Sequence, residues 1–430
     1  MWAAEMGVGK SRAAIELMRR MGWPRTIIVA PAAVIRSVWP QQLELWGDSN
    51  LRYTIIDGKV LGRSRQSAGQ RRIAMIMSAD IVLINYESIH RDPVGGHLKH
   101  RFKAELLIMD ESHRIKSPSG VISRYMAQLA NRVPKRLAMT GTPMPHSPMD
   151  IYAQYRALDK EIFGVSAQHF RFQYAIRHPL WPGVIVGWKC KGDLRKRFER
   201  IAIQVKADDV LSLPPFVDST YMVELSTNAK RLIDEAKNEF ILEVKTGIIT
   251  IPNALVKLLR LQQIASGFLH PEGGILEVFD TAKMDALSSI FEDIGETHVV
   301  VFCRFRQDLI HIAKTAVKSD LLCWEISGEK KQLEQWNSEG GVLAVQMQSG
   351  GLGLDFTKAR TAIYYSLGYS LGDYMQTRAR VHRPGQEQSV HYIHLIASDS
   401  VDIDIMRAIN KKKEIISEII DGINSGGWEL

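Results

Sequence analysis

The sequence has few of the features that mark membrane and secreted proteins. No stretch approaches about eighteen consecutive apolar residues, the length that a membrane-spanning helix needs. The first residues lack the charged-then-apolar pattern of a secretory signal. The three cysteines, Cys190, Cys303 and Cys323, are far apart, and their spacing indicates neither a disulfide framework nor a metal site. We therefore expect a protein without a membrane segment in a reducing, cytoplasmic compartment.

Acidic residues are fewer than basic ones. The chain has 55 Lys and Arg against 47 Asp and Glu, a net charge of +8 and a pI near 9.2. Such a balance suits a polyanionic partner such as nucleic acid, although many basic proteins bind none. With 430 residues, 45% of them hydrophobic, the chain is long enough for two or three domains with sizeable cores.

Short apolar runs alternate with amphipathic stretches, twice along the chain. Bounded apolar runs of this kind are typical of buried parallel strands. The expected strands are 26–30, 81–85, 105–109 and 136–140 in the first part, and 298–302, 322–326, 342–346, 361–365 and 391–396 in the second. Helical stretches such as 281–294 and 304–317 fall between them. The pattern predicts an α/β protein with two sheets in tandem.

The stretch between the two sheets, about 156–275, has a different character. It carries the basic run KCKGDLRKRFER at 189–200, a Leu-Pro-Pro turn at 213–215 and two helical patterns at 227–245 and 252–266. The tail 400–423 predicts one more amphipathic helix.

The opening MWAAEMGVGKS contains a candidate phosphate-binding loop. Glycines let backbone N–H groups turn inward onto phosphates, a lysine holds the terminal phosphates, and a hydroxyl holds magnesium. Gly7, Gly9, Lys10 and Ser11 supply these groups, and a helix follows with its positive end toward the loop. Ala4 stands where the strict pattern has its first glycine, so a glycine-containing turn before an ordinary helix is the alternative.

Two later segments carry chemistry of the same kind. Asp110 and Glu111 follow an apolar strand, where a carboxylate can hold magnesium and its neighbour can orient and deprotonate the attacking water. A solvated surface pair is the alternative for these two residues. Thr140-Gly141-Thr142-Pro143 ends another strand with a turn that could face the same sheet edge, or could be a plain turn.

Together these segments resemble the superfamily-two helicase core, and more narrowly its Snf-type branch of ATP-dependent DNA translocases. AEMGVGKS is similar to motif I of that family, TIIVAPAAVIRSVWPQQLELW to motif Ia, DESH to motif II and TGTP to motif III. In the second part, VVVFCRF resembles motif IV, QMQSGGLGLDF motif V and YMQTRARVHRPGQEQSV motif VI. The resemblance covers nearly the whole chain and implies two tandem RecA-like domains with parallel sheets and a helical insertion between them.

The chain departs from the family pattern in several places. Ala4 replaces an aspartate, Ser11 a threonine, Gln204 an arginine and Asp355 an asparagine. The family also has an upstream glutamine motif that reads adenine, and a strand that feeds the phosphate loop. Because only six residues come before Gly7, we expect both to be missing here. We place the first RecA-like lobe at 1–155, the insertion at 156–275, the second lobe at 276–400 and a C-terminal helix at 401–430.

The resemblance assigns a role to each site residue. Glu5, Met6, Gly7, Val8, Gly9, Lys10, Ser11 and Gln376 would bind ATP, and Ser11 and Asp110 would hold Mg²⁺. Lys10, Asp110, Glu111, Arg380 and Arg383 would carry the hydrolysis, the two arginines as fingers from the second lobe. Thr140, Gly141, Thr142, Gly350 and Gly351 would couple hydrolysis to movement. Arg36, Ser37 and Ser349, together with the 189–200 run, are candidate contacts to DNA phosphates.

These roles imply an ATP-dependent translocase on double-stranded DNA. The alternatives are a strand-separating DNA or RNA helicase, and a DNA-binding clamp that does not hydrolyse ATP because its adenine-reading segment is missing. We expect a monomer with no membrane partner, from a bacterial cell or a virus-infected bacterial cell.

Overall fold

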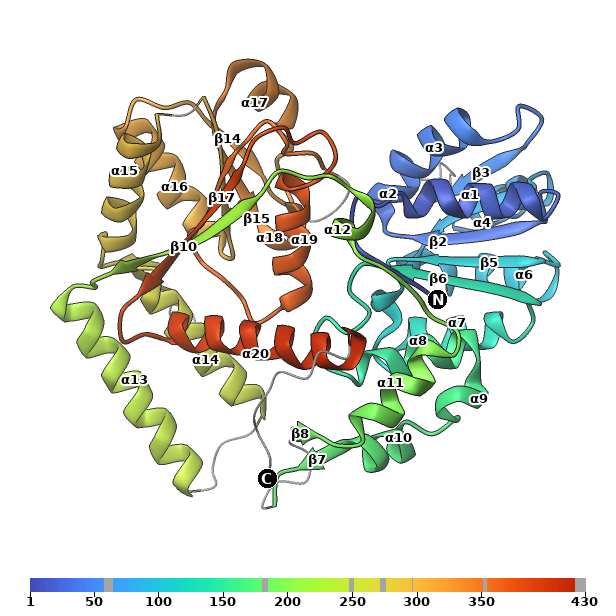
Figure 1. Ribbon diagram of the computed structural model, residues 1–430, viewed down its shortest axis with the longest axis horizontal. Helices are drawn as coiled ribbons and strands as arrows, with labels where there is room; N and C mark the ends of the chain where they lie inside the picture. The colour runs from blue at the N-terminus through green and yellow to red at the C-terminus, as the bar shows by residue number, and fades with distance from the viewer. Residues whose placement is uncertain are drawn as a thin grey trace. The chain divides into compact units, whose positions relative to one another are not determined.

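The computed structural model describes residues 1–57, 65–179, 185–246, 251–270, 276–295, 297–350 and 354–421. The chain forms two compact units, whose elements are labelled in Figure 1. Unit 1 comprises Met1–Ser212 and the end of the chain from Lys412, and unit 2 comprises Leu213–Lys411. The segment 156–275 thus contributes to both units.

Unit 1 is built on a seven-stranded sheet in which all neighbouring strands run parallel. Every residue of three central strands is buried, which is why these strands are continuous apolar runs. The strand order is β3 (Tyr53–Ile56), β4 (Ile81–Asn85), β2 (Thr26–Ala30), β5 (Leu106–Asp110), β6 (Lys135–Thr140), β1 (Trp2–Ala4) and β9 (Ile203–Val205).

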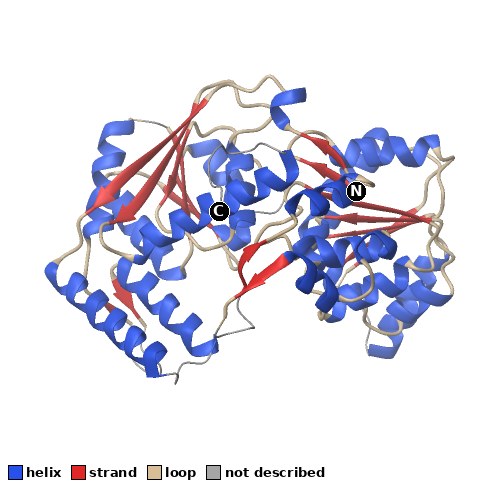
Figure 2. Cartoon of the chain, turned by 60° about the horizontal axis from the view of Figure 1, so that its bottom comes forward, coloured by secondary structure: helices blue, strands red, loops and turns tan. Residues whose placement is uncertain are grey.

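Helices cover both faces of this sheet (Figure 2), because parallel strands need crossover connections. One face carries α1 (Lys10–Arg20), α2 (Ala32–Arg36) and α3 (Val38–Trp46). The other face carries α4 (Arg65–Met77), α5 (Tyr86–Ile89), α6 (Val94–His100), the 3₁₀ turn η1 (Ser112–Ile115), α7 (Val121–Ala130) and α8 (Asp150–Leu158).

A strand does lead into the Gly7–Ser11 loop, and the expectation that it is missing was wrong. Trp2–Ala4 forms β1, which pairs in parallel with both β6 and β9. Three residues suffice because the strand is held on two sides, and because Met1 adds two further hydrogen bonds. Its amino group donates to the Ile201 carbonyl, and its own carbonyl accepts from the Ile203 N–H. The loop therefore starts at the carboxyl end of a paired strand, as a phosphate-binding loop requires.

The rest of unit 1 packs around a cluster of aromatic rings. Its elements are α9 (Lys160–Phe163), α10 (Ala167–Tyr174), the antiparallel hairpin of β7 (Ala175–Arg177) and β8 (Ile185–Trp188), α11 (Lys191–Glu199) and α12 (Ala207–Val210). Ring centroids lie 4.7–6.2 Å apart within the cluster, which fixes α9, α10 and α11 against α8. The rings are those of Tyr152, Tyr155, Phe163, Phe170, Tyr174 and Phe198.

Unit 2 contains a second parallel sheet, of six strands. Their order is β10 (Phe216–Val223), β17 (Val390–Ala397), β16 (Thr361–Tyr364), β13 (His298–Cys303), β15 (Gly341–Gln346) and β14 (Cys323–Ile326). A small hairpin joins β11 (Phe268–Leu269) and β12 (Glu277–Val278). The helices are α13 (Thr227–Thr246), α14 (Ile251–Ala265), α15 (Ala282–Ile294), α16 (Arg306–Lys318), α17 (Leu333–Glu339), α18 (Met347–Gly350), α19 (Leu371–Val381) and α20 (Val401–Asp421).

The two parallel sheets confirm the predicted fold class of two tandem α/β domains. No helix within the described ranges combines the length and the apolar character of a membrane span.

Candidate active site

The phosphate-binding loop turns through two glycines in the left-handed region. Gly7 has φ 85° and Gly9 has φ 86°, values that other residues rarely adopt. Gly9 is also the N-cap of α1, and no side chain caps this helix end. The first N–H groups of α1 can therefore donate to an anion at the loop, with the helix dipole in their favour.

Lys10 and Glu5 both form hydrogen bonds that hold this loop. The Lys10 ammonium donates to the carbonyls of Ala4, at 2.9 Å, and Glu5, at 2.8 Å. The Glu5 carboxylate accepts from the N–H of Ala207 at 2.8 Å, so it attaches the loop to the start of α12. The structure gives the Glu5 side chain this backbone partner, and its contact with ATP stays a prediction. Met6, Val8 and Ser11 are partly exposed at the loop.

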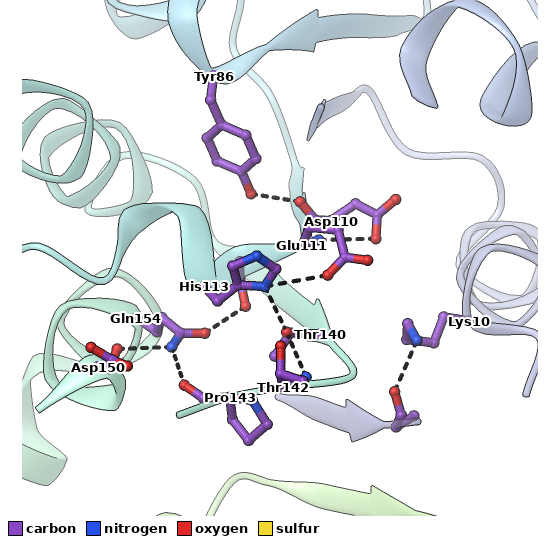
Figure 3. Close-up of polar contacts among 12 residues, drawn as sticks. Lys10, Tyr86, Asp110, Glu111, His113, Thr140, Thr142, Pro143, Asp150 and Gln154 are labelled. Carbon is purple, nitrogen blue, oxygen red and sulfur yellow. Dashed lines mark hydrogen bonds and ion pairs between the residues drawn. The ribbon is translucent and has the colours of Figure 1, made fainter. Parts of the chain in front are cut away.

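Asp110 ends β5 next to the loop, with its carboxylate buried and firmly oriented. One oxygen accepts from the Trp39 indole at 3.0 Å and the other from the Glu111 N–H at 3.0 Å. The Tyr86 hydroxyl donates to the Asp110 carbonyl at 2.8 Å (Figure 3). Burial raises the pKa of Asp110 to about 6, with a further contribution from the Glu111 carboxylate, while the Lys10 ammonium opposes the shift.

Glu111 is held by an unusual backbone conformation and by His113. Its φ of 50° places it in the left-handed region, which a non-glycine residue occupies at some energetic cost. Its carboxylate is largely buried and lies 3.3 Å from Nδ1 of His113. The side chain is therefore oriented before any substrate arrives, as a water-positioning group needs to be.

His113 connects Glu111 to the threonines of the TGTP turn. The same Nδ1 lies 3.1 Å from the Thr140 hydroxyl oxygen, which also accepts from the Thr142 N–H at 3.1 Å (Figure 3). Gly141 packs closely on the phosphate loop, because a Cβ added there would come within 3.1 Å of Met6 Cγ. The predicted coupling residues of unit 1 therefore touch both Glu111's partner and the nucleotide loop.

Gln154 is a site residue that the sequence analysis missed. It is fully buried on α8, where its amide oxygen accepts from the Ser112 hydroxyl at 2.7 Å. Its amide nitrogen donates to the carbonyls of Pro143, at 2.7 Å, and Asp150, at 2.8 Å. Gln154 thereby joins the DESH segment to the TGTP turn. A signal existed, since a glutamine within the apolar run IYAQYRAL predicts a buried polar group that needs partners.

Two predicted DNA contacts of unit 1, Arg36 and Ser37, lie on an exposed surface. Nε of Arg36 lies 2.7 Å from a carboxylate oxygen of Asp57, and the Ser37 hydroxyl donates to the Ala33 carbonyl at 2.9 Å. Trp39, two residues on, is fully buried against Asp110 and links this helical segment to the active site.

The remaining predicted site residues belong to unit 2. Gln376 and Arg380 lie on α19, and both are partly exposed. Arg383 follows the helix; its Nη1 donates to the Leu354 carbonyl at 3.3 Å and lies 3.8 Å from the Asp355 carboxylate. Its buried Nε has no hydrogen-bond partner among the described residues. Ser349 and Gly350 fall in α18, whereas Gly351 lies outside the described residues.

Family models match almost the entire chain. The model of the SNF2-related domain matches residues 1–266, and that of the helicase conserved C-terminal domain matches residues 282–385. The chain belongs to the SNF2-related family. Membership in the SNF2-related family confirms the predicted Snf-type branch of superfamily two, and with it the prediction of a DNA-dependent ATPase.

Individual proteins show the same likeness. The chain is 25% identical over 458 residues to protein p41 of Acyrthosiphon pisum secondary endosymbiont phage 1, covering 98% of this chain and 94% of that protein. It is 23% identical over 447 residues to the DNA annealing helicase and endonuclease ZRANB3 of Bos taurus, where it spans only 39% of that protein's length. Among solved structures, the Sulfolobus solfataricus SWI2/SNF2 ATPase core in complex with dsDNA has a TM-score of 0.44 and 20% identity, covering 98% of this chain and 88% of that chain.

Proposed function

We propose that this SNF2-related protein moves along double-stranded DNA at the expense of ATP, without obligatory strand separation. The observation that carries the proposal is the assembly of Lys10, Asp110 and Glu111 at one sheet edge, with Glu111 joined through His113 to Thr140. A phosphate-binding cation, a metal-binding carboxylate and a water-positioning carboxylate are the groups that ATP hydrolysis requires.

In the proposed reaction, the loop and Lys10 hold the ATP phosphates while Glu111 positions a water molecule. The water oxygen attacks the γ-phosphorus, Glu111 accepts a proton of the water, and the bond from phosphorus to the β–γ bridging oxygen breaks, giving ADP and phosphate. Gln376, on α19, is proposed to bind the nucleotide as well. Arg380 and Arg383 act as arginine fingers, which are typically worth about 10³–10⁵ in rate.

Mg²⁺ fits the residues present. Magnesium prefers one or two carboxylates together with substrate phosphates, and Asp110 offers a buried carboxylate beside the loop while Ser11 offers a hydroxyl. A divalent cation there would offset the cost of ionising Asp110, whose pKa burial raises to about 6. The ion would neutralise charge on the phosphates when bound.

We further propose that Thr140, Gly141 and Thr142, with Gly350 and Gly351 of unit 2, couple hydrolysis to movement. Arg36, Ser37 and Ser349 would contact DNA phosphates, so binding would depend on salt and little on sequence. One relative, matched over nearly its full length, is a phage protein, which supports action in the cytoplasm of a bacterial or virus-infected bacterial cell. We propose that the protein acts there as a monomer.

The test is ATP hydrolysis measured without nucleic acid and with single strands, RNA or blunt duplex, beside Glu111→Gln as control. Duplex should stimulate the rate far more than the other nucleic acids, and Glu111→Gln or Lys10→Ala should abolish hydrolysis. Stimulation by single strands or RNA instead would indicate a strand-separating helicase. A folded protein without turnover on any nucleic acid would indicate a clamp.

A further inference from the structure

One surface of unit 1 carries side chains to which the proposed function gives no role, apart from Lys189, which opens the 189–200 run named above as a candidate DNA contact. It lies where α10 runs into the β7–β8 hairpin, at the bottom of Figure 1. Four side chains define it, and we name it the basic–aromatic surface: Arg171 and Phe172 on α10, Arg177 at the end of β7, and Lys189 after β8. All four are exposed.

Positive charge is concentrated in this part of the chain. Residues 165–200 contain eight Lys and Arg against two acidic residues, so their net charge is +6 in a chain whose net charge is +8. The two acidic residues are already engaged, since Asp193 pairs with Arg197 at 3.0 Å and Glu199 with Arg195 at 2.7 Å. The surplus of positive charge is therefore not neutralised within the segment.

The two arginines of the surface differ from Arg195 and Arg197 in having no acidic partner. Within the described part of the chain, neither Arg171 nor Arg177 takes part in an ion pair or a side-chain hydrogen bond. Both guanidinium groups are available to an anion from outside. Arginine binds phosphate through a planar fork of donors, which makes it the preferred side chain for this purpose.

An exposed aromatic ring lies among these charges. Phe172 is 70% exposed, and the Lys189 ammonium lies 5.4 Å from its ring centroid, within cation–π range. A phenylalanine this exposed loses the stabilisation that burial of its ring would bring. Stacking against a planar partner would recover it.

The backbone beneath the surface is well held. The Lys189 N–H donates to the Tyr174 carbonyl at 2.8 Å, and the Tyr174 hydroxyl donates to Asp193 at 2.6 Å. Tyr174 is itself buried in the aromatic cluster. The four side chains therefore start from fixed positions, which lowers the entropy that binding would cost.

We propose that the basic–aromatic surface binds single-stranded nucleic acid, with an unpaired base stacked on Phe172 and neighbouring phosphates on Arg171, Arg177 and Lys189. Exposed aromatic rings between basic side chains are the usual means of holding single strands, because every base has a face that can stack. In an intact duplex the base faces are already stacked on each other, so Phe172 would find no partner there. The site goes beyond the proposed duplex-tracking function and would let the motor hold a DNA with both paired and unpaired parts.

The test is binding of a fluorescein-labelled oligothymidylate of about 16 nucleotides to the full chain, in the presence of excess unlabelled blunt duplex. The duplex occupies the proposed track, so the remaining binding reports on a separate site. Phe172→Ala should weaken it by about fivefold to 150-fold, since stacking of one base contributes about 1–3 kcal/mol. Phe172→Trp should bind at least as well as the unmodified chain.

The arginines are tested by salt dependence. Arg171→Gln with Arg177→Gln should lower the slope of log affinity against log salt by about 1.4, because each single-strand phosphate contributes about 0.7. The matched control is Arg101→Gln with Arg132→Gln, which removes the same charge from two exposed arginines elsewhere in unit 1. Equal effects of the two double variants would overturn the proposal, as would unchanged binding by Phe172→Ala.

Two further measurements distinguish the single-strand site from the proposed function and from a protein-binding surface. Duplex-stimulated ATP hydrolysis should be unchanged in Phe172→Ala; if the unmodified chain itself shows no such stimulation, the proposed function fails while the single-strand site stands. A labelled polyglutamate peptide tests the other polyanion that suits the charge. If Phe172→Ala no longer binds the peptide but still binds oligothymidylate, the surface binds protein and the proposal is wrong.

Discussion

His113 is the residue through which the DESH segment and the TGTP turn of the candidate active site meet. Its Nδ1 lies 3.3 Å from Glu111 and 3.1 Å from Thr140. A single imidazole nitrogen thus faces both the carboxylate proposed to position water and the turn proposed to couple hydrolysis to movement. Loss of the ring would remove one of the contacts that hold the Glu111 carboxylate.

His113→Ala should therefore lower the turnover number of duplex-stimulated ATP hydrolysis by about tenfold to a hundredfold, a part of what a positioned general base contributes. The KM for ATP should change little, because the contacts of His113 are with Glu111 and Thr140. Steady-state kinetics measure both quantities. His100→Ala, which removes an exposed histidine of the same unit, is the control. A rise in KM without loss of turnover would show that His113 acts on nucleotide binding instead.

Asp110 makes magnesium binding depend on pH. Its pKa is raised from the usual 3.8 to about 6, chiefly by burial, so the protonated form is favoured in the folded chain. The stabilisation from this group is present at low pH and is lost as pH rises through about 6, where the carboxylate ionises. Only the ionised form can hold the cation, and the cation would then compensate for the buried charge.

Mg²⁺ with ADP should accordingly raise the Tm more at about pH 7.5 than at about pH 5.5, relative to ADP with EDTA. Thermal unfolding followed by fluorescence measures the difference. In Asp110→Asn the added effect of Mg²⁺ should disappear at both pH values. An equal Mg²⁺ effect on either side of pH 6 in the unmodified chain would contradict the assignment.

Among the helices and strands, α19 is anchored to the first strand of unit 2 by Arg378. The guanidinium forms a two-pronged pair with Asp218 on β10, lies 3.9 Å from the Tyr392 ring centroid and 4.8 Å from that of Phe216. Close by, Nε2 of His382 lies 2.7 Å from the Pro214 carbonyl oxygen. The helix that carries Arg380 is thus fixed to β10, at the start of unit 2.

Asp218→Ala should destabilise unit 2 by about 1–3 kcal/mol, because it leaves the largely buried Arg378 charge poorly compensated, whereas Arg378→Ala leaves a partly exposed carboxylate and acts mainly through lost packing of the arginine. The double variant should cost less than the sum of the two, with a coupling of about 1–3 kcal/mol in a double-mutant cycle. Urea unfolding of the four proteins gives the cycle. Strictly additive losses would mean that the pair contributes packing of the arginine stem and no mutual stabilisation.

For the chain as a whole, α20 contributes to both compact units. The helix starts in unit 2, where Asp402 pairs with the buried Lys283 at 2.6 Å. The residues from Lys412 onward belong to unit 1, where Ile419 is 1% exposed within the main core cluster. The last described turns of α20 therefore add to a core whose other buried members come from the first 212 residues.

Ile419→Ala should destabilise unit 1 by about 2–5 kcal/mol, the usual cost of truncating a buried isoleucine. The loss should appear in the unfolding transition that nucleotide stabilises, since the nucleotide loop lies in the same unit. Thermal unfolding with and without ADP makes the comparison. Lys411→Ala, an exposed position on the same helix, is the control and should leave that transition unchanged.

The local pattern of apolar and polar residues predicted most of the strands and helices. The strand 26–30 was predicted with its observed bounds, and the helix expected at 227–245 is Thr227–Thr246. The short strands β1, β3 and β9 went unpredicted, because three or four residues carry too little pattern to separate a strand from a loop. For β1 this led to the wrong expectation that the phosphate loop lacked a strand.

Motif spacing indicated the family and the candidate nucleotide-binding residues, and apolar runs predicted the two parallel sheets. Both signals come from residues that are near one another in the chain. The hydrogen bonds of other side chains depend on partners that are distant in the sequence. Gln154 is hydrogen-bonded to Ser112, which is 42 residues away in the sequence. Arg378 and Asp218 are 160 residues apart, and Glu5 and Ala207 are 202 apart. No local pattern specifies such pairs; they form only when the sheets and helices have packed, since packing brings distant groups within hydrogen-bonding distance and removes the water that would otherwise satisfy them.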